Sequence, residues 1–142
     1  MMKSKLRYCI TAAVCVCSII LYSCDKAFDN LKLDHLWRLD SINYGGDDIP
    51  VTDIYYGFAA NTVEIHKADS YHYMGKVFNI EDSLKLDFGP YFNNPSYDSL
   101  QVISKLKSYG IDSIVETFAV KTLDRSRLVL SNRAKTLSFT RW

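Results

Sequence analysis

Cysteine is scarce in this sequence and is confined to its beginning. The 142 residues contain four cysteines, Cys9, Cys15, Cys17 and Cys24. The chain after residue 24 therefore cannot form an internal disulfide, so a domain built from it must be stabilised by its apolar core. The same absence excludes a cysteine-ligated metal site and a cysteine nucleophile from that part of the chain.

An excess of charge of one sign is also missing. The chain has 17 Lys and Arg residues against 16 Asp and Glu residues, a formal net charge of +1. The basic residues form no stripe, and phosphate backbones are bound chiefly by clustered Lys and Arg. We therefore expect no nucleic acid partner. With six glycines and no glycine-rich loop, a phosphate-binding loop is not expected either.

No apolar run is long enough to favour a membrane-spanning helix. The longest extends from Tyr8 to about Leu21 and stops before the charged pair Asp25-Lys26. It falls short of the roughly 20 apolar residues that cross a bilayer. Three basic residues precede it, at positions 3, 5 and 7. This layout is typical of a secretory signal peptide, which we predict over residues 1–23.

The predicted signal peptide ends in a motif with a specific chemistry. Leu21-Tyr22-Ser23-Cys24 has an aliphatic residue three positions before a cysteine and a small residue directly before it. It resembles the lipobox of bacterial lipoproteins, in which the cysteine thiol receives a diacylglycerol before cleavage. The resemblance implies that Cys24 is the lipid attachment site and that the membrane is a partner through this lipid. It also implies an outer-membrane location, on the periplasmic face or at the cell surface.

Residues 36–142 are expected to form one domain, and residues 24–35 a lipidated tether before it. Short segments of alternating apolar and polar residues dominate the domain, with turn residues between them. The aromatic-rich segment 54–59 fits either a strand or a loop packed across a barrel mouth. The other predicted strands are 36–44, 62–67, 71–80, 84–88, 115–123, 127–131 and 136–142.

One helix is predicted, over about residues 97–109. Ser96 is in the N-cap position, and Gly110 follows as the residue that ends the helix. A single helix among many short strands favours a barrel with a lid or a plug. The apolar residues that recur along the helix, and that must lie on an apolar surface, are Leu100, Val102, Ile103, Leu106 and Tyr109.

The predicted fold is mainly β: an antiparallel barrel of about 7–8 strands with this one inserted α-helix. Five segments of the domain have the pattern of a known family. These segments are Leu36-Trp37-Arg38-Leu39, Tyr109-Gly110-Ile111, Phe118-Ala119-Val120-Lys121-Thr122-Leu123, Arg127-Leu128-Val129-Leu130 and Leu137-Ser138-Phe139-Thr140-Arg141. Together they resemble the small lipocalin-like lipoproteins of Bacteroidetes. The chain departs from true lipocalins because it has no Gly-x-Trp at the first strand and no disulfide. The resemblance therefore implies a lipocalin-like β-barrel and carries little about activity.

The aromatic residues are the most suggestive binding feature. Ligand pockets are lined by apolar and aromatic groups with a few polar anchors, and tyrosine supplies both. Barrel interiors are also filled by large side chains, so a packed core and a ligand cavity both stay open. The candidate ligand-binding residues are Tyr55, Tyr56, Phe58, Tyr71 and Tyr73.

A metal site is the second possibility that the residue pattern raises. Glu64 and His66 alternate onto one face of a predicted strand, and His72 follows across the next turn. Imidazole and carboxylate groups on neighbouring strands suit zinc. A solvent-facing polar surface opposite Val63 and Ile65 explains the same residues, and we favour it. Neither a metal site nor a cofactor is therefore expected.

Catalysis has the weakest support. Asp47-Asp48 and Glu81-Asp82 are adjacent acids in predicted turns, whereas a glycosidase needs two carboxylates on opposite sides of a sugar. A hydrolase is therefore the third hypothesis. The leading one is a lipid-anchored, non-enzymatic, lipocalin-like domain that binds a small apolar ligand or a partner protein. The alternative is a structural accessory subunit of an envelope complex that has no ligand.

Overall fold

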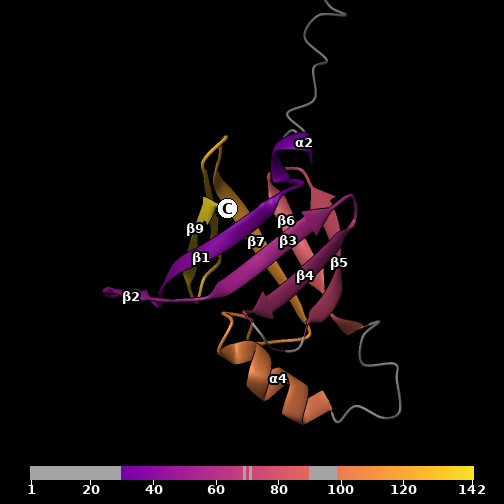
Figure 1. Cartoon of the computed structure of the whole chain (residues 1–142), viewed down its shortest axis with the longest axis vertical. Coiled ribbons are helices and arrows are strands. Elements are labelled where there is room, and N and C mark those ends of the chain that lie inside the picture. The colour runs from indigo at the N-terminus through magenta and orange to yellow at the C-terminus, as the bar shows by residue number, and fades with distance from the viewer. Residues whose placement is uncertain (1–29, 69, 71, 90–98) are drawn as a thin grey trace, which may run out of the picture.

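Eight antiparallel strands close into a barrel in the computed structural model, which describes residues 30–68, 70, 72–89 and 99–142 (Figure 1). The ring runs β1-β3-β4-β5-β6-β7-β8-β9, and β9 pairs with β1 to close it. The predicted mainly β barrel is confirmed, and the segment left open between strand and loop is strand β3. The bounds are β1 Leu36–Asn43, β3 Ile54–Ala59, β4 Thr62–Lys67, β5 Tyr73–Ile80, β6 Ser83–Asp87, β7 Val115–Leu123, β8 Arg127–Ser131 and β9 Thr136–Arg141.

A short additional strand lies beside the ring. β2, Asp48–Pro50, pairs with the second half of β1, whereas β3 pairs with its first half. The turn predicted around Asp47-Asp48 gives way to this strand at Asp48, and the alternation does not predict the strand. All three β2 residues are exposed. β2 therefore satisfies backbone groups along an edge of β1 and contributes no side chain to the core.

Side chains alternate between the inside and the outside of the barrel along its strands. Trp37 and Leu39 of β1 face inward and are buried. Val63 and Ile65 of β4 are also buried, on the face opposite Glu64 and His66, as the alternation of that strand predicts. Fully burying a large apolar side chain contributes about 1.5–3 kcal/mol. This contribution, repeated around the ring, stabilises a domain that has no cysteine after residue 24.

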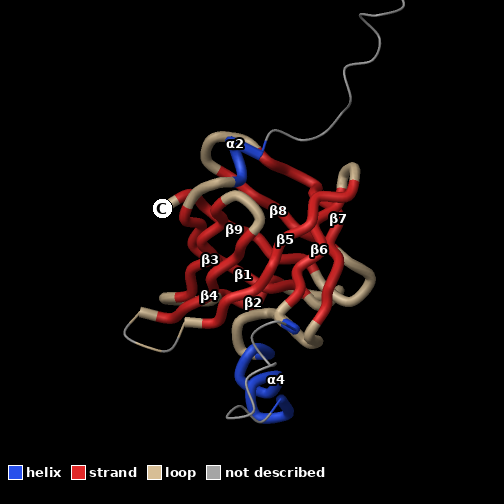
Figure 2. The backbone as a smooth tube through the Cα atoms, turned by 90° about the vertical axis from the view of Figure 1, so that its right-hand side faces the viewer, coloured by secondary structure: helices blue, strands red, loops and turns tan. Residues whose placement is uncertain are grey.

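Helix α4, Ser99–Lys107, lies across one end of the barrel (Figure 2). Residues 97 and 98, with which the predicted helix begins, lie outside the described residues. The helix ends in a Schellman motif. The Gly110 amide donates to the Lys107 carbonyl at 3.0 Å, and the Ile111 amide donates to the Leu106 carbonyl at 3.0 Å. Gly110 has a φ of +89°, so its predicted role as the terminating residue is confirmed.

The buried face of α4 differs from the predicted one. Val102, Leu106 and Tyr109 are buried, whereas Leu100 is 75% exposed. Three residues rotate a helix by only about 300°, so a strict spacing of three drifts away from the core. Spacings of four and then three keep Val102, Leu106 and Tyr109 on one stripe. This stripe packs on the barrel core, so α4 covers that end as a lid.

A second short helix lies at the opposite end of the barrel (Figures 1 and 2). It is α2, Asn30–Leu33. Leu33 is 1% exposed, and its carbonyl accepts a hydrogen bond of 2.9 Å from Trp37 Nε1. The last residues of the segment predicted as a tether therefore belong to the packed domain. Among the described residues, no helix has the length and apolar character that crossing a bilayer requires.

Candidate functional site

The five aromatic residues predicted to bind a ligand do not line a single space. Tyr56 and Phe58 of β3 and Tyr73 of β5 are buried in the interior. Tyr55 alternates with Tyr56, so it lies on the outer face of β3, where it is half-buried. Tyr71 and the predicted lipid attachment site Cys24 lie outside the described residues.

The interior of the described barrel is filled with side chains. Trp37, Tyr56, Phe118 and Phe139 are each 0–1% exposed, and so are the leucines of β6 and β8. A cavity wide enough for a small ligand leaves the side chains around it partly accessible. Tyr56 packs edge-on against Phe139 with ring centroids 4.9 Å apart, a favourable aromatic geometry. The interior therefore has the properties of a core.

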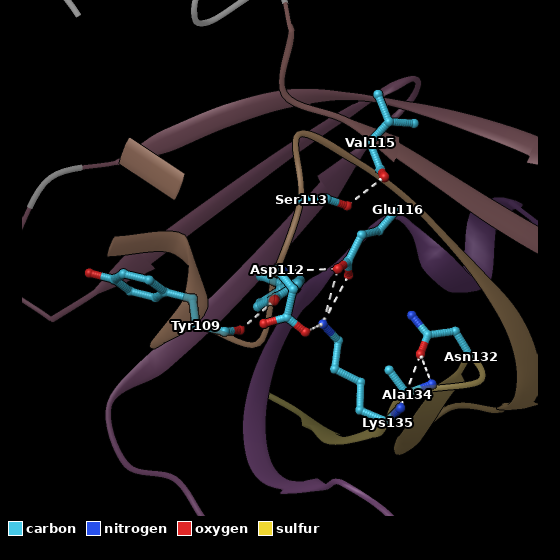
Figure 3. Close-up of polar contacts among 9 residues, drawn as sticks. Tyr109, Asp112, Ser113, Val115, Glu116, Asn132, Ala134 and Lys135 are labelled. Atoms are coloured by element: carbon cyan, nitrogen blue, oxygen red, sulfur yellow. Dashed lines mark hydrogen bonds and ion pairs between the residues drawn. The ribbon is translucent and has the colours of Figure 1, made fainter. Parts of the chain in front are cut away.

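An ion cluster centred on a buried lysine lies between the end of α4 and the turn that joins β8 to β9 (Figure 3). Lys135 Nζ lies 2.5 Å from Asp112 Oδ2 and 3.1 Å from each carboxylate oxygen of Glu116. The Asp112 amide donates to Glu116 Oε1 at 2.9 Å. The side chain of Lys135 is completely buried. A buried ammonium group must be paired and hydrogen-bonded, and these two carboxylates meet that requirement.

Tyr56 joins β3 to the segment between α4 and this cluster. Its hydroxyl donates a hydrogen bond of 2.6 Å to the backbone carbonyl of Tyr109. Burial raises the pKa of Tyr56 well above its ordinary value of 10.0, and the negative charge of Glu116 raises it further. The phenol is therefore a stable neutral donor. Together with the Lys135 cluster it fixes the segment that follows the helix.

The Lys135 cluster was not among the residues predicted from sequence. A lysine in a turn is normally solvated, and residues 132–135 carry the pattern of an ordinary turn. The inward orientation of Glu116 could have been predicted, because this residue lies two positions before the inward-facing Phe118 on the same strand. Nothing in the sequence indicates that Lys135 is its partner. The cluster offers no open surface of Lys135 to a substrate, which favours a structural role.

Glu64, His66 and His72 lie together on the outside of the barrel. In the β4–β5 register, Glu64 is opposite Met74 and Ile65 is opposite Tyr73, so His66 is opposite His72. One ligand atom from each of the three residues lies within 4.8 Å of the others. His72 Nδ1 and Glu64 Oε1 are in direct contact. The sequence pattern therefore selected three side chains that the fold brings together.

Aromatic rings continue from this cluster across the outer surface. The His66 and His72 rings are stacked, with centroids 4.7 Å apart and planes 14° apart. Tyr55 stacks on His66 at 5.5 Å. Trp142 meets the Tyr55 ring edge-on at 5.3 Å. Burial lowers the pKa of His66 from its ordinary value of 6.5, and the neighbouring His72 lowers it further, while Glu64 opposes both.

The paired acids do not form a catalytic arrangement. Asp47 precedes β2 and Asp48 is its first residue, and both are exposed; Glu81 and Asp82 are exposed in the turn between β5 and β6. Glu81 has a φ of +53°, a backbone conformation that suits a tight turn. These acids are explained by turn formation and solvation.

The comparisons with known proteins agree with this architecture. The family model described as a lipocalin-like domain matches residues 19–142. The chain belongs to the lipocalin-like domain family. A match of this kind identifies the barrel, a fold typical of binding proteins, and names no ligand or reaction. No curated protein matches the sequence.

Two solved structures have a similar fold. A lipocalin-like protein from Bacteroides uniformis is 19% identical to this lipocalin-like domain with a TM-score of 0.62, over 78% of this chain and 99% of the other. An uncharacterized protein from Bacteroides eggerthii is 20% identical with a TM-score of 0.60, over 76% of this chain and 98% of the other. At these identities the likeness establishes the shared fold alone.

Proposed function

We propose that this lipocalin-like domain is a lipid-anchored, non-enzymatic envelope protein that binds a partner protein through the outside of its barrel. Cys24 carries the lipid in this proposal. The sequence Leu21-Tyr22-Ser23-Cys24 supports the anchor. Two acyl chains on one cysteine are sufficient for stable membrane attachment.

The close packing of the barrel interior favours a protein partner over a small ligand. Its inward-facing side chains meet one another, α4 covers one end, and Leu33 is buried at the other. A ligand entering this interior would have to displace close-packed side chains, which costs the dispersion contacts that they make. Binding on the outer surface requires no such rearrangement.

The outer face of β5 supplies three exposed apolar side chains for such a partner, with the exposed Lys76 between the first two. Met74 is 51% exposed, Phe78 is 42% exposed and Ile80 is 52% exposed. These residues are separated by even intervals, so they share one face of the strand. Exposed large apolar side chains gathered on one element are typical of an interaction surface.

The position of α2 orients the domain relative to the membrane in this proposal. Asn30 lies at the α2 end of the barrel, opposite α4 (Figures 1 and 2). Cys24 is six residues upstream of Asn30, and six residues span at most about 20 Å. The α2 end therefore stays close to the membrane, and the α4 end points away from it.

Crosslinking in isolated membranes tests the partner proposal, with native mass spectrometry of the recovered protein. We expect a co-purified protein and no bound apolar small molecule. Phe78→Gln should reduce the crosslinked yield severalfold, because it places an amide in the centre of the β5 surface. Leu100→Gln is the matched control, since it makes the same change at an exposed apolar residue of α4 and should leave the yield unchanged.

Two results contradict the proposal. Recovery of a stoichiometric apolar molecule with no protein partner supports the ligand-binding alternative. An equal loss of crosslinking in Phe78→Gln and Leu100→Gln would show that the outer face of β5 is not the binding surface.

A further inference from the structure

We propose that Glu64, His66 and His72 form a zinc-binding site on the outer face of the barrel. The proposal rests on the placement of three side chains from β4 and the residue before β5. It does not require a partner on β5, although Glu64 lies directly opposite Met74 of that surface. Two imidazoles and one carboxylate form a ligand set that zinc accepts, with one further position left for water.

The backbone brings the three ligands together without rearrangement. Glu64 and His66 are two residues apart on β4, so both face outward. His72 immediately precedes β5 and lies opposite His66 in the β4–β5 register. The side chains of a directly opposed pair and of a diagonal neighbour lie within reach of one another on an antiparallel sheet.

The distances suit a small divalent cation. No two of the candidate ligand atoms are more than 4.8 Å apart. Ligands that lie about 2.0–2.2 Å from zinc in a tetrahedron are about 3.3–3.5 Å from each other. The side chains of His72 and Glu64 are 57% and 41% exposed. Rotation of the Glu64 and His72 side chains closes the remaining gap and turns the His72 ring toward an ion that it shares with His66.

The surroundings of His66 hold its ring in place. Tyr55 stacks on one side of it and His72 on the other. His66 Nδ1 is buried and has no hydrogen-bond partner. Because an imidazole nitrogen that faces neither water nor a donor is destabilised, one ring nitrogen remains for a ligand interaction that the protein itself does not supply.

Zinc titration of the purified full-length protein in detergent tests the site. The protein carries no histidine tag, and the probe is Zn²⁺ alone, followed by calorimetry. We expect one ion per chain and a rise in the unfolding temperature, because an ion that binds only the folded state stabilises it. Co²⁺ should bind with the visible absorption bands of a low-coordinate site. Mg²⁺ and Ca²⁺, which prefer oxygen ligands, should not compete.

Two ligand variants and one control test the site. His72→Gln and Glu64→Gln change exposed side chains and should each weaken Zn²⁺ binding by about 10-fold or more. His35→Gln is the matched control, because His35 is the remaining histidine of the chain and pairs with Arg141 away from the cluster. Circular dichroism checks that each variant is folded.

The expected pattern is a loss of affinity in the two cluster variants with unchanged binding in His35→Gln. The proposal is overturned by a wild type that binds no zinc at micromolar concentration. It is equally overturned by folded cluster variants that bind zinc as tightly as the wild type, or by an equal loss in His35→Gln.

Discussion

Tyr56 joins β3 to the segment after α4 through one buried hydrogen bond. Tyr56→Phe leaves the Tyr109 carbonyl without its donor, so we expect the free energy of unfolding to fall by about 1–3 kcal/mol. Denaturant titration of the purified variant measures this change. Tyr44→Phe, which alters an exposed tyrosine, should have little effect, and an equal loss in both variants would contradict the assigned role.

The raised pKa of Tyr56 also predicts a pH dependence. Above about pH 10 the phenol ionises in the unfolded chain, while burial keeps it neutral in the folded protein. The unfolded state therefore binds fewer protons, and stability falls as the pH rises. Unfolding measured between about pH 8 and about pH 11 should show a less steep loss in Tyr56→Phe than in the wild type. Identical slopes would exclude Tyr56 as a source of the alkaline sensitivity.

Lys135 balances the buried carboxylate of Glu116. Lys135→Met leaves that carboxylate without its partner, and breaking a buried pair from one side costs about 3–5 kcal/mol. We expect Lys135→Met/Glu116→Gln to recover part of this loss, because the buried charge is then removed. Chemical denaturation of the single and double variants measures the coupling. Lys121→Met, at an exposed position of β7, is the control, and a double variant less stable than Lys135→Met would argue against charge pairing.

At the scale of the element, the end of α4 depends on Gly110. A Cβ at this residue would lie 2.9 Å from Leu137 Cδ2, and its φ is +89°. Gly45 has a φ of +90° with nothing within 4 Å of such a Cβ. Gly45→Ala therefore isolates the backbone penalty, of about 1–3 kcal/mol. Gly110→Ala adds overpacking of the core.

We expect Gly110→Ala to lower the free energy of unfolding by about 1–3 kcal/mol more than Gly45→Ala. Thermal or denaturant unfolding of the two variants provides the comparison. Equal losses would mean that Leu137 moves aside at no cost and that the helix end is not closely packed on the barrel.

At the scale of the whole molecule, the location of the protein depends on Cys24. Cys24→Ala removes the thiol that receives the lipid in the proposed function. We expect this variant to leave the membrane fraction or to retain its leader, as followed by fractionation and intact mass. Cys17→Ala changes a thiol inside the predicted leader and should behave as the wild type. The lipid anchor is contradicted if the Cys24→Ala protein remains in the membrane fraction and has the same processing and the same added lipid mass as the wild type.

Local patterns in the sequence predicted most of the elements. Alternation placed Val63 and Ile65 on the inner face of their strand, and Gly110 marked the end of the helix, because period-two burial and left-handed backbone are encoded by neighbouring residues. The same reasoning failed for Leu100, since spacing alone does not reveal which side of a helix meets the core. Strand β2 was not predicted, because its pairing depends on where β3 stops pairing with β1 and not on the residues of β2 itself.

The sequence by itself determined the strand faces, the helix end, the lack of disulfides in the domain and the cluster of Glu64, His66 and His72 as neighbours on one surface. Only the tertiary structure decided that Lys135 pairs with Glu116 and that the aromatic side chains of the interior fill it. These features join residues far apart in the chain, such as Tyr56 and Tyr109. Their contacts depend on how the closed barrel arranges its interior, and no local pattern of residues encodes that arrangement.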